Sequence, residues 1–218
     1  MQRGSGLTAR REPPSADLPA KKARTRLPAT ERKTQIAEMT LRLAAELGPG
    51  AVTTEWIAER LGISQAAIFR HFPRKGMIWS AAATMLGEEM RMAWDAVQDD
   101  LPAERRLRAM ALAHLAYVES TPGLLAILFS RELHAENEAL RTGLAVNQRR
   151  FQARLASIVL EGSKNGRFRG DLDPSDTAFL VIAVVQSVAM RWSLSAKRFS
   201  LIAEGERLID ALMRGFLR

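Results

Sequence analysis

Residues 57–72, IAERLGISQAAIFRHF, carry the strongest indication of how this chain folds. Its Gly62 can adopt the left-handed backbone conformation that ends one short helix, and Ser64 can cap the helix that follows. The small side chain of Ala58 lets the two helices cross closely. Two short helices joined by a tight glycine turn form a helix-turn-helix, which sets its second helix in the major groove of DNA. An ordinary helical hairpin that does not bind DNA is the alternative.

The second helix of this pair has two faces. An inward stripe is formed at helical spacing by Ile63, Ile68 and Phe72. The outward positions are Gln65, Ala66, Ala67, Arg70 and His71. No acid lies between Glu59 and Glu88, where the chain carries Arg60, Arg70, Arg74 and Lys75. A local cationic face is what a phosphate-contacting surface needs, although a solvated basic face without a partner has the same pattern.

The overall composition excludes several classes of protein. The chain has 218 residues, 47% of them hydrophobic, which is enough for one large or two small domains. It has no cysteine, so disulfides and thiolate metal or redox sites are excluded. The longest apolar run, 178–185, falls short of the roughly 20 residues that cross a bilayer. The N-terminus lacks the apolar core of a secretory signal, and we expect no membrane segment.

Charge and helical pattern divide the chain into three parts. Residues 1–29 are predicted to be a disordered basic arm, since residues 1–28 hold seven lysines and arginines against two acids. Arg24 and Arg26 of this arm either add nonspecific phosphate contacts or belong to an inert extension. Residues 30–90 contain the helix-turn-helix and are neutral in sum from residue 29. Residues 91–218 are predicted to form a second, larger helical domain.

Apolar residues recur at helical spacing along the rest of the chain without any alternating strand pattern, so the predicted fold class is all-α. Thr30 is a candidate N-cap for the first helix, and the glycines and proline at 48–50 end it. Residues 134–138 are expected to be an interhelical loop. The predicted helices cover about 30–47, 54–61, 64–71, 74–97, 102–120, 122–130, 136–163, 174–192 and 198–217.

These features together resemble the TetR-type transcriptional regulators, the tetracycline-repressor-like (TetR/AcrR) family. The resemblance is strongest over residues 30–90. It rests on Ile36, Leu43, Gly48, Thr53, Thr54, the stretch 57–64, the stretch 68–72, Lys75 and Ile78. The distal half matches more loosely, through 161–162, 166–169 and 171–174.

The resemblance implies an all-helical homodimer of about nine helices. Its three-helix N-terminal domain would bind a pseudo-palindromic double-stranded operator. Its C-terminal domain, 91–218, would dimerise through the last two helices and hold a small molecule that displaces the fourth helix and releases the DNA. The implied role is that of a repressor in the cytoplasm, associated with the bacterial nucleoid. The alternatives are an activator, or a DNA-binding protein controlled by a protein partner or by no effector.

Three positions depart from the family pattern. Many relatives have tyrosine where Phe69 stands, so a contact of Phe69 with DNA would be apolar packing without the phosphate hydrogen bond of a hydroxyl. An aromatic residue often stands where Ala44 lies, and Trp56 is a candidate to fill that space. Trp56 occupies a place that is usually polar, so packing against the DNA backbone is its alternative role.

Three side chains are candidates for phosphate contacts. Thr54, at a helix N-terminus, offers its hydroxyl and nearby backbone N–H groups. His71 and Lys75 match phosphate-contacting positions of the family. For His71 the alternative is a helix C-cap without a role on DNA, and Arg74 is expected to be a solvated charge.

Base contacts are expected from the second helix. The amide of Gln65 can pair with adenine, and the guanidinium of Arg70 can pair with guanine or bind a phosphate instead. Ala66 and Ala67 permit close approach and can touch thymine methyl groups.

Inward residues of the distal half are candidates for a ligand pocket and a dimer interface, with core packing inside one chain as the alternative for each. The pocket candidates are Met90, Trp94, Met110, His114, Tyr117, Leu125, Phe129 and Phe151. Few of the inward positions are charged, so an apolar or amphipathic effector is expected. The candidates for a four-helix seam between two subunits are Phe179, Val185, Val188, Trp192, Leu208, Leu212 and Phe216.

An enzyme is not expected. The sequence has no cysteine nucleophile and no glycine-rich phosphate loop. The segment from His134 to Glu138 lacks the second histidine of the helical zinc motif, and Glu88-Glu89 is read as a solvated face. No cofactor and no metal are predicted.

Overall fold

The computed structural model describes residues 27–218, except for the side chain of Pro122. The predicted basic arm, with Arg24 and Arg26, lies almost wholly outside these residues. The elements are α1 (Ala29–Leu47), the 3-10 turn η1 (Pro49–Ala51), α2 (Thr54–Leu61), α3 (Gln65–His71), α4 (Lys75–Asp95), α5 (Ala103–Ser120), α6 (Pro122–Leu128), α7 (Arg131–Glu136), α8 (Glu138–Lys164), α9 (Pro174–Leu194) and α10 (Leu201–Met213). Between residues 27 and 218 the sole extended pairing is an isolated bridge of Phe168 with Leu217. The all-α prediction is confirmed.

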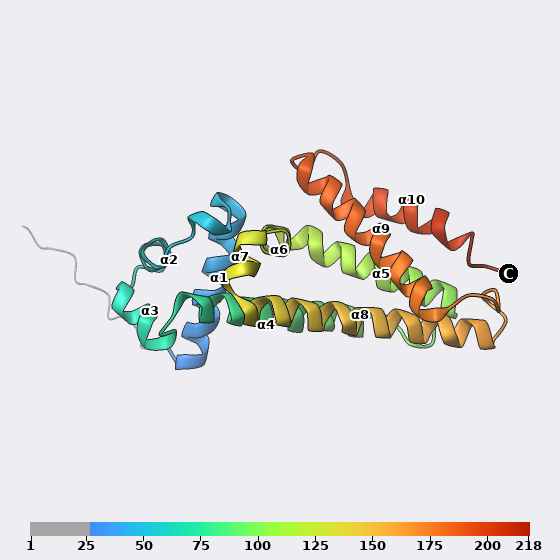
Figure 1. Cartoon of the computed structure of the whole chain (residues 1–218), viewed down its shortest axis with the longest axis horizontal. Coiled ribbons are helices and arrows are strands. Elements are labelled where there is room, and N and C mark those ends of the chain that lie inside the picture. The colour runs from blue at the N-terminus through green and yellow to red at the C-terminus, as the bar shows by residue number, and fades with distance from the viewer. Residues whose placement is uncertain (1–26) are drawn as a thin grey trace, which may run out of the picture.

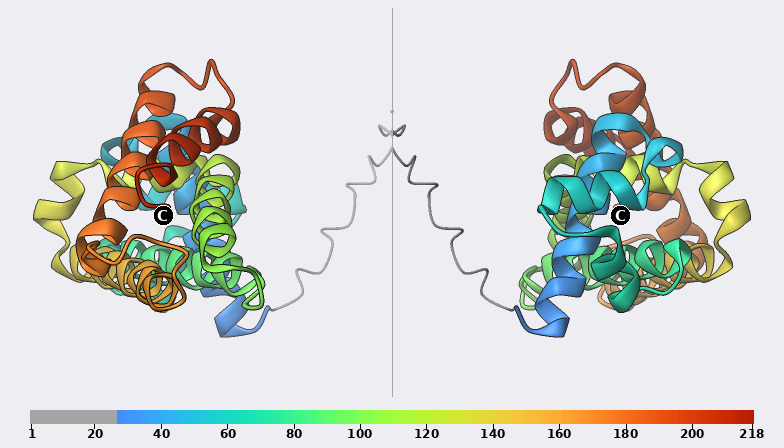
Figure 2. Two further views of the ribbon diagram at one scale, coloured as in Figure 1. Left: turned by 90° about the vertical axis from the view of Figure 1, so that its right-hand side faces the viewer. Right: turned by 90° about the vertical axis from the view of Figure 1, so that its left-hand side faces the viewer.

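Two long helices carry the architecture. In Figure 1, α4 and α8 run side by side along the length of the molecule and contact each other. The small N-terminal helices α2 and α3 lie at one end, and the C-terminus lies at the other. Seen end-on in Figure 2, α9 and α10 lie together along one side of the bundle, where they pack on α8 and α5. Helix α4 therefore connects the N-terminal head, which consists of α1, α2 and α3, to the C-terminal bundle, which consists of α5 to α10.

The turn in the head has the predicted chemistry. Gly62 has a positive φ of 61°, and the backbone N–H of Ile63 bonds to the carbonyl of Ala58 at 3.0 Å, which closes α2. Thr53 Oγ1 accepts from the N–H of Trp56 at 3.2 Å. Ser64 Oγ accepts from the N–H of Ala67 at 3.2 Å. Both hydroxyls satisfy donors that a helix N-terminus leaves free.

A continuous apolar core joins the head to the bundle. In the head, Ile36, Ile57 and Ile68 have no exposed surface, and in the bundle the same is true of Leu115 and Leu155. Burial of this apolar surface drives the helices together. Since α1 packs on both α4 and α6, the head contacts the bundle at more than one helix.

Three predicted boundaries are wrong. The first helix begins at Ala29 after Pro28, without a side-chain cap, so Thr30 lies inside it. The expected loop at 134–138 is largely helical, because Ser130 Oγ accepts from the N–H of Leu133 at 3.2 Å and starts α7. The last helix begins at Leu201 rather than at 198, since Ala196 and Lys197 have positive φ and Ser200 caps the helix.

Helix α9 is long and apolar enough to cross a membrane, by length and composition alone, with a mean hydropathy of 1.5 over its apolar window. The sequence prediction missed this because it considered uninterrupted apolar runs. Its residues Val181, Val185 and Trp192 are buried in the protein core. The core helix of a soluble protein passes the same test, so this helix is weak evidence for a membrane span.

Candidate DNA interface and ligand cavity

Helix α3 presents one face to the core and one to solvent. Ile68 and Phe72 are buried, as the inward stripe requires. Ala66, Phe69 and Arg70 are exposed, while Gln65, Ala67 and His71 are partly exposed. The outward residues of the helix-turn-helix are therefore accessible to a duplex, and their contacts with bases stay predictions.

The side chain of Gln65 is held by α2. Its Nε2 donates to Thr54 Oγ1 at 2.8 Å and to Glu55 Oε1 at 2.6 Å. A carboxylate only accepts hydrogen bonds, so the amide nitrogen must face Glu55. Both amide hydrogens are thereby used, and the carbonyl oxygen of Gln65 is left as an acceptor. Bidentate pairing with adenine, the contact expected for Gln65, requires one of these two bonds to break.

Thr54 and Glu55 shape the N-terminus of α2. Thr54 is buried, and its hydroxyl oxygen accepts from Gln65, so its hydroxyl contributes to the joint between α2 and α3. Its backbone N–H is still placed at the start of α2, where a phosphate contact stays a prediction. Hydrogen bonds from its own backbone N–H, from Thr53 and from Gln65 lower the pKa of Glu55. The charged carboxylate of Glu55 therefore lies beside α3, the recognition helix of the helix-turn-helix, where it repels phosphates.

The cationic face is narrower than the sequence suggests. Arg60 pairs with Glu46 at 3.0 Å, so its charge is balanced. Arg60 is therefore not the free cation that the sequence pattern suggested. Arg70, Arg74 and Lys75 are exposed and form no ion pair with any residue between 27 and 218. These three cations remain available for DNA phosphates.

His71 is the last residue of α3. Burial lowers its pKa, and so do the nearby charges of Arg70, Arg32 and Lys33. The neutral imidazole is therefore favoured near pH 7, which leaves it one N–H donor for a phosphate oxygen. Its ring makes no hydrogen bond with the end of α3 in the described part of the chain, so the C-cap alternative finds no support there.

The two aromatic departures from the family pattern are both on the surface. Trp56 has 45% of its surface exposed and Phe69 has 42%. Trp56 therefore does not fill the core beside Ala44, which is itself buried. The large buried aromatic residue of this region is Trp79, on α4, and α4 packs on α1.

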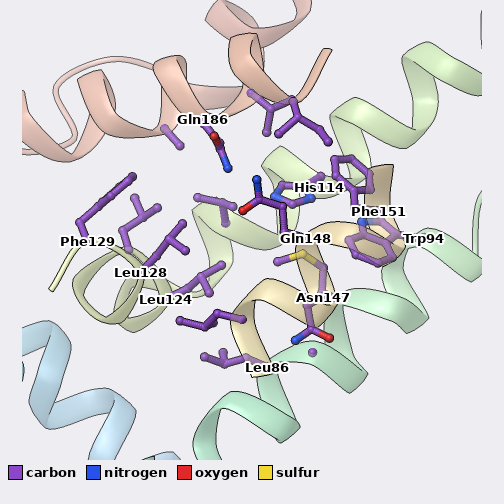
Figure 3. Close-up of a pocket in the computed structure, with 18 residues that line it drawn as sticks. Leu86, Trp94, His114, Leu124, Leu128, Phe129, Asn147, Gln148, Phe151 and Gln186 are labelled. Atoms are coloured by element: carbon purple, nitrogen blue, oxygen red, sulfur yellow. The ribbon is translucent and has the colours of Figure 1, made fainter. Parts of the chain in front are cut away.

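A cavity of about 80 Å³ lies between α4, α5, α6, α8 and α9 (Figure 3). Six of the predicted pocket residues line it: Met90, Trp94, His114, Leu125, Phe129 and Phe151. Met110 and Tyr117 do not line it. Met110 is buried in the core, and the Tyr117 hydroxyl donates to Glu89 Oε2 at 2.9 Å.

Sequence reasoning missed more than half of the cavity wall. The additional lining residues are Leu86, Gly87, Val118, Leu124, Leu128, Leu144, Asn147, Gln148, Ile182, Val185, Gln186 and Ala189. Helical spacing marks the inward face of α8 and α9, but it does not say which neighbour each face meets. The three amides are polar residues on otherwise apolar faces, and that interruption was the available signal.

Three aromatic rings form one end of the cavity. The Phe151 ring centroid lies 4.7 Å from that of Trp94 and 4.4 Å from that of His114. Trp94 Nε1 and His114 Nδ1 are buried without a hydrogen-bond partner among the described residues. Burial lowers the pKa of His114 to about 4, because a charged imidazole would lose its hydration there. His114 is therefore neutral at pH 7.

The predicted dimer residues divide into two groups. Val185, Val188, Trp192 and Phe216 are buried within their own chain, so core packing, the alternative, accounts for them. Phe179 has 56% of its surface exposed, and Leu208 and Leu212 are partly exposed. The exposed apolar surface of α9 also includes Leu180, which the sequence prediction omitted. A contact with a second subunit stays a prediction.

Comparisons with known proteins agree with this geometry. The model of the bacterial regulatory proteins of the tetR family matches residues 36–82, and that of the tetracyclin repressor-like C-terminal domain matches residues 103–201. A nucleoid occlusion factor SlmA from Marinobacter nauticus is 32% identical over 158 residues, which cover 68% of this chain and 77% of the relative. Another SlmA, from Marinomonas, is 26% identical and covers 72% of this chain and 80% of the relative.

Solved structures share the fold. A TetR transcription regulator from Haloarcula marismortui has a TM-score of 0.76 at 20% identity, covering 87% of this chain and 100% of the other. FadR from Bacillus subtilis, in complex with stearoyl-CoA, has a TM-score of 0.72 at 20% identity, covering 84% and 98%. A regulator from Saccharomonospora viridis, in complex with choline, has a TM-score of 0.73 at 22% identity, covering 87% and 99%. With the family models, the relatives and the helix-turn-helix in agreement, this chain belongs to the TetR family and is a DNA-binding regulator.

Proposed function

We propose that this regulator is a homodimeric repressor that leaves its operator when a small molecule enters the cavity between α4 and α9. The observation that carries the proposal is the dual position of α4. Its first residue, Lys75, belongs to the candidate DNA interface, and its Leu86, Gly87, Met90 and Trp94 line the cavity. One rigid helix thus touches both sites.

The length of α4 provides a physical route for mechanical coupling between the two sites. Lys75 and Leu86 are eleven positions apart, which is about 16 Å along a helix. A ligand that displaces the wall at Leu86 or Met90 moves the helix as a body, because packed helices shift rather than bend. The heads of a dimer would then lose the spacing that two half-sites one helical turn apart require. Differential affinity of the ligand for the two arrangements supplies the free energy.

The proposed dimer would use α9 and α10. The exposed apolar side chains Phe179 and Leu180 on α9, with the partly exposed Leu208 and Leu212 on α10, offer a surface that a second copy can cover. Two-fold symmetry would bring the same patch of each subunit together. We place the dimer in the cytoplasm at the nucleoid. We assign it no catalysis, and the residues that line its cavity include no carboxylate, serine or lysine.

The test has two stages. Duplexes selected from a random pool by the purified full-length protein should contain a two-fold-symmetric site. A compound library is then screened for release of that site, and each hit is tested on the variant Ala189→Phe, whose larger side chain would fill the cavity. Hits that release the wild type and leave the variant bound support the proposal. Hits that release both equally contradict it.

A second function has its own support. The curated relatives reported above are named nucleoid occlusion factors, and the cavity is small. A DNA-binding protein controlled by a protein partner, or by no effector, would fit both observations. In that case no compound would release the selected site, and filling the cavity with Ala189→Phe would leave operator binding unchanged.

A further inference from the structure

We propose that the ligand of this cavity is an uncharged, compact molecule, with a hydrocarbon body and at least one hydroxyl or carbonyl group. The polar group would bind the carboxamides of Asn147, Gln148 and Gln186. This inference rests on the proposed function, since it names the chemical class of the effector for the same site.

The cavity wall carries no charge that could balance a charged ligand. None of its eighteen lining residues is an aspartate, glutamate, lysine or arginine, and thirteen are Leu, Ile, Val, Met, Phe, Trp or Ala. An unpaired ion in such surroundings loses its hydration without compensation, which is far costlier than burying a neutral polar group. His114 adds no charge at neutral pH, because burial keeps its imidazole deprotonated.

Three polar side chains of the wall are carboxamides, and the other polar groups are the neutral imidazole of His114 and the indole N–H of Trp94. Asn147 and Gln148 come from α8 and Gln186 comes from α9. Among residues 27–218 their side chains have no hydrogen-bond partner within bonding distance. Each carboxamide both donates and accepts, so it pairs with a hydroxyl or a carbonyl and needs no countercharge. A site built to bond such a group discriminates strongly against an analogue that lacks it.

The arrangement of the wall also gives the ligand an orientation. In Figure 3, Leu124, Leu128 and Phe129 lie at one end of the cavity, and Trp94, His114 and Phe151 lie at the other. Gln148 and Gln186 lie between the two ends, with their amides toward each other. The hydrocarbon body would therefore occupy an apolar end, with its polar group near the middle.

Size limits the ligand further. One water needs about 10–15 Å³ of such space, so a cavity of about 80 Å³ has room for about five to eight non-hydrogen atoms. A single substituted ring fits this scale better than a long chain does. The amide of Asn147 lies against the backbone of Gly87 on α4, so close that a Cβ at Gly87 would collide with it. Asn147 therefore limits the space for a ligand on the α4 side of the cavity.

The test uses four probes that share one ring and differ in one substituent. These are cyclohexylmethanol, methylcyclohexane, cyclohexanecarboxylate and cyclohexylmethylammonium. Their dissociation constants for the full-length protein are measured by ligand-detected NMR at pH 7.5, with Ala189→Phe to identify binding in the cavity. We expect the alcohol to bind about tenfold or more tightly than either ion, because the ions must be buried unpaired.

A variant pair tests the amides. The double variant Gln148→Leu with Gln186→Leu should reduce the preference for the alcohol over methylcyclohexane by about threefold to tenfold, the equivalent of one neutral hydrogen bond. Gln98→Leu, an exposed glutamine outside the cavity, is the control and should leave the preference unchanged. Circular dichroism and operator binding confirm that each variant folds.

The outcomes separate this inference from the function on which it rests. Preferential binding of the carboxylate or the ammonium in the cavity overturns the uncharged ligand and leaves control by a small molecule intact. An unchanged preference in the double variant overturns the role of the amides. Failure of all four probes to bind, together with no library hit that depends on the cavity, overturns both.

Discussion

The side-chain amide nitrogen of Gln65, the first residue of the recognition helix, donates a hydrogen bond of 2.6 Å to Glu55 Oε1 at the start of α2. With its second hydrogen bonded to Thr54, this amide shows only its carbonyl oxygen to a duplex. An acceptor in the major groove selects bases with an exocyclic amino group, which are adenine and cytosine. Glu55 thus influences base recognition through another residue.

Removal of Glu55 should change the base preference. Glu55→Ala frees one amide hydrogen of Gln65, which can then pair with adenine through both amide atoms. Adenine should gain over cytosine at that position by about 1 kcal/mol, measured by sequencing duplexes selected from a random pool. The control Glu59→Ala removes an equal, exposed charge from α2. An equal change in both variants would mean that only charge matters.

Lys75 should supply affinity without sequence preference. Lys75→Ala removes a cation at the start of α4. The negative slope of log K against log salt should become flatter by about 0.9, the value for one phosphate contact. The loss should be similar on operator and on random duplex. Arg74→Ala is the matched control: Arg74 is an exposed neighbouring cation but is expected to be a solvated charge, so we expect little change. Salt titrations of binding measure both, and identical slopes for Lys75→Ala and wild type would remove Lys75 from the interface.

Acid should destabilise the protein through His114. Its folded pKa of about 4 lies below the unfolded value of 6.5, so the unfolded chain binds the proton more tightly. The contribution of the neutral imidazole to the free energy of unfolding is fully present above pH 6.5, decreases as the pH falls, and is lost as the pH passes the folded pKa near 4. The free energy of unfolding should therefore decrease by about 2 kcal/mol between pH 7.5 and pH 5.

Urea unfolding across this range, compared with the variant His114→Phe, measures the effect. The variant should show a much flatter dependence on pH, since its side chain does not titrate. His71, whose pKa is also lowered, contributes the same sign and remains in both proteins. If the stability of His114→Phe falls with acid as much as that of the wild type, other groups cause the loss of stability. His134→Gln serves as the control for loss of a histidine.

The contact between head and bundle should be intolerant of one methyl group at Gly123. A Cβ there would lie 2.5 Å from the carbonyl oxygen of Leu41 on α1. Because a backbone atom cannot move aside easily, Gly123→Ala should destabilise the protein by about 1–3 kcal/mol. At Gly143 the nearest atom would lie 3.9 Å away, so Gly143→Ala should be neutral or stabilise by up to about 1 kcal/mol. Equal effects in urea unfolding would refute the close approach of α6 to α1.

Charge on the exposed face of α9 should separate the subunits. The double variant Phe179→Glu with Leu180→Glu places two carboxylates where a two-fold axis would bring them against their copies. We expect a monomer in size-exclusion chromatography with light scattering at micromolar concentration. Met92→Glu changes an equally exposed side chain on α4 and should remain a dimer. A dimeric double variant would place the interface elsewhere.

The local chemistry of the head could be predicted from sequence because it depends on near neighbours. The cap at Ser64 and the turn at Gly62 are found as expected, since each acts on residues within five positions along the chain. Helix α7 was missed because its cap, Ser130, starts a helix of only six residues, which is too short to show periodicity. Of the two roles considered for Trp56, filling the core beside Ala44 is wrong, because local pattern does not say how deep a partly apolar helix lies.

The all-α class and the helix-turn-helix could therefore be predicted from short-range spacing, and the family from the resemblance of residues 30–90. Three other relationships are seen only once the helices are packed: Gln65 is bonded to Glu55, Arg60 is paired with Glu46, and Gln186 of α9 lines the same cavity as His114 of α5. These relationships join residues on different helices. Periodicity shows which face of a helix is buried, but the packing partner of that face is set by the whole core.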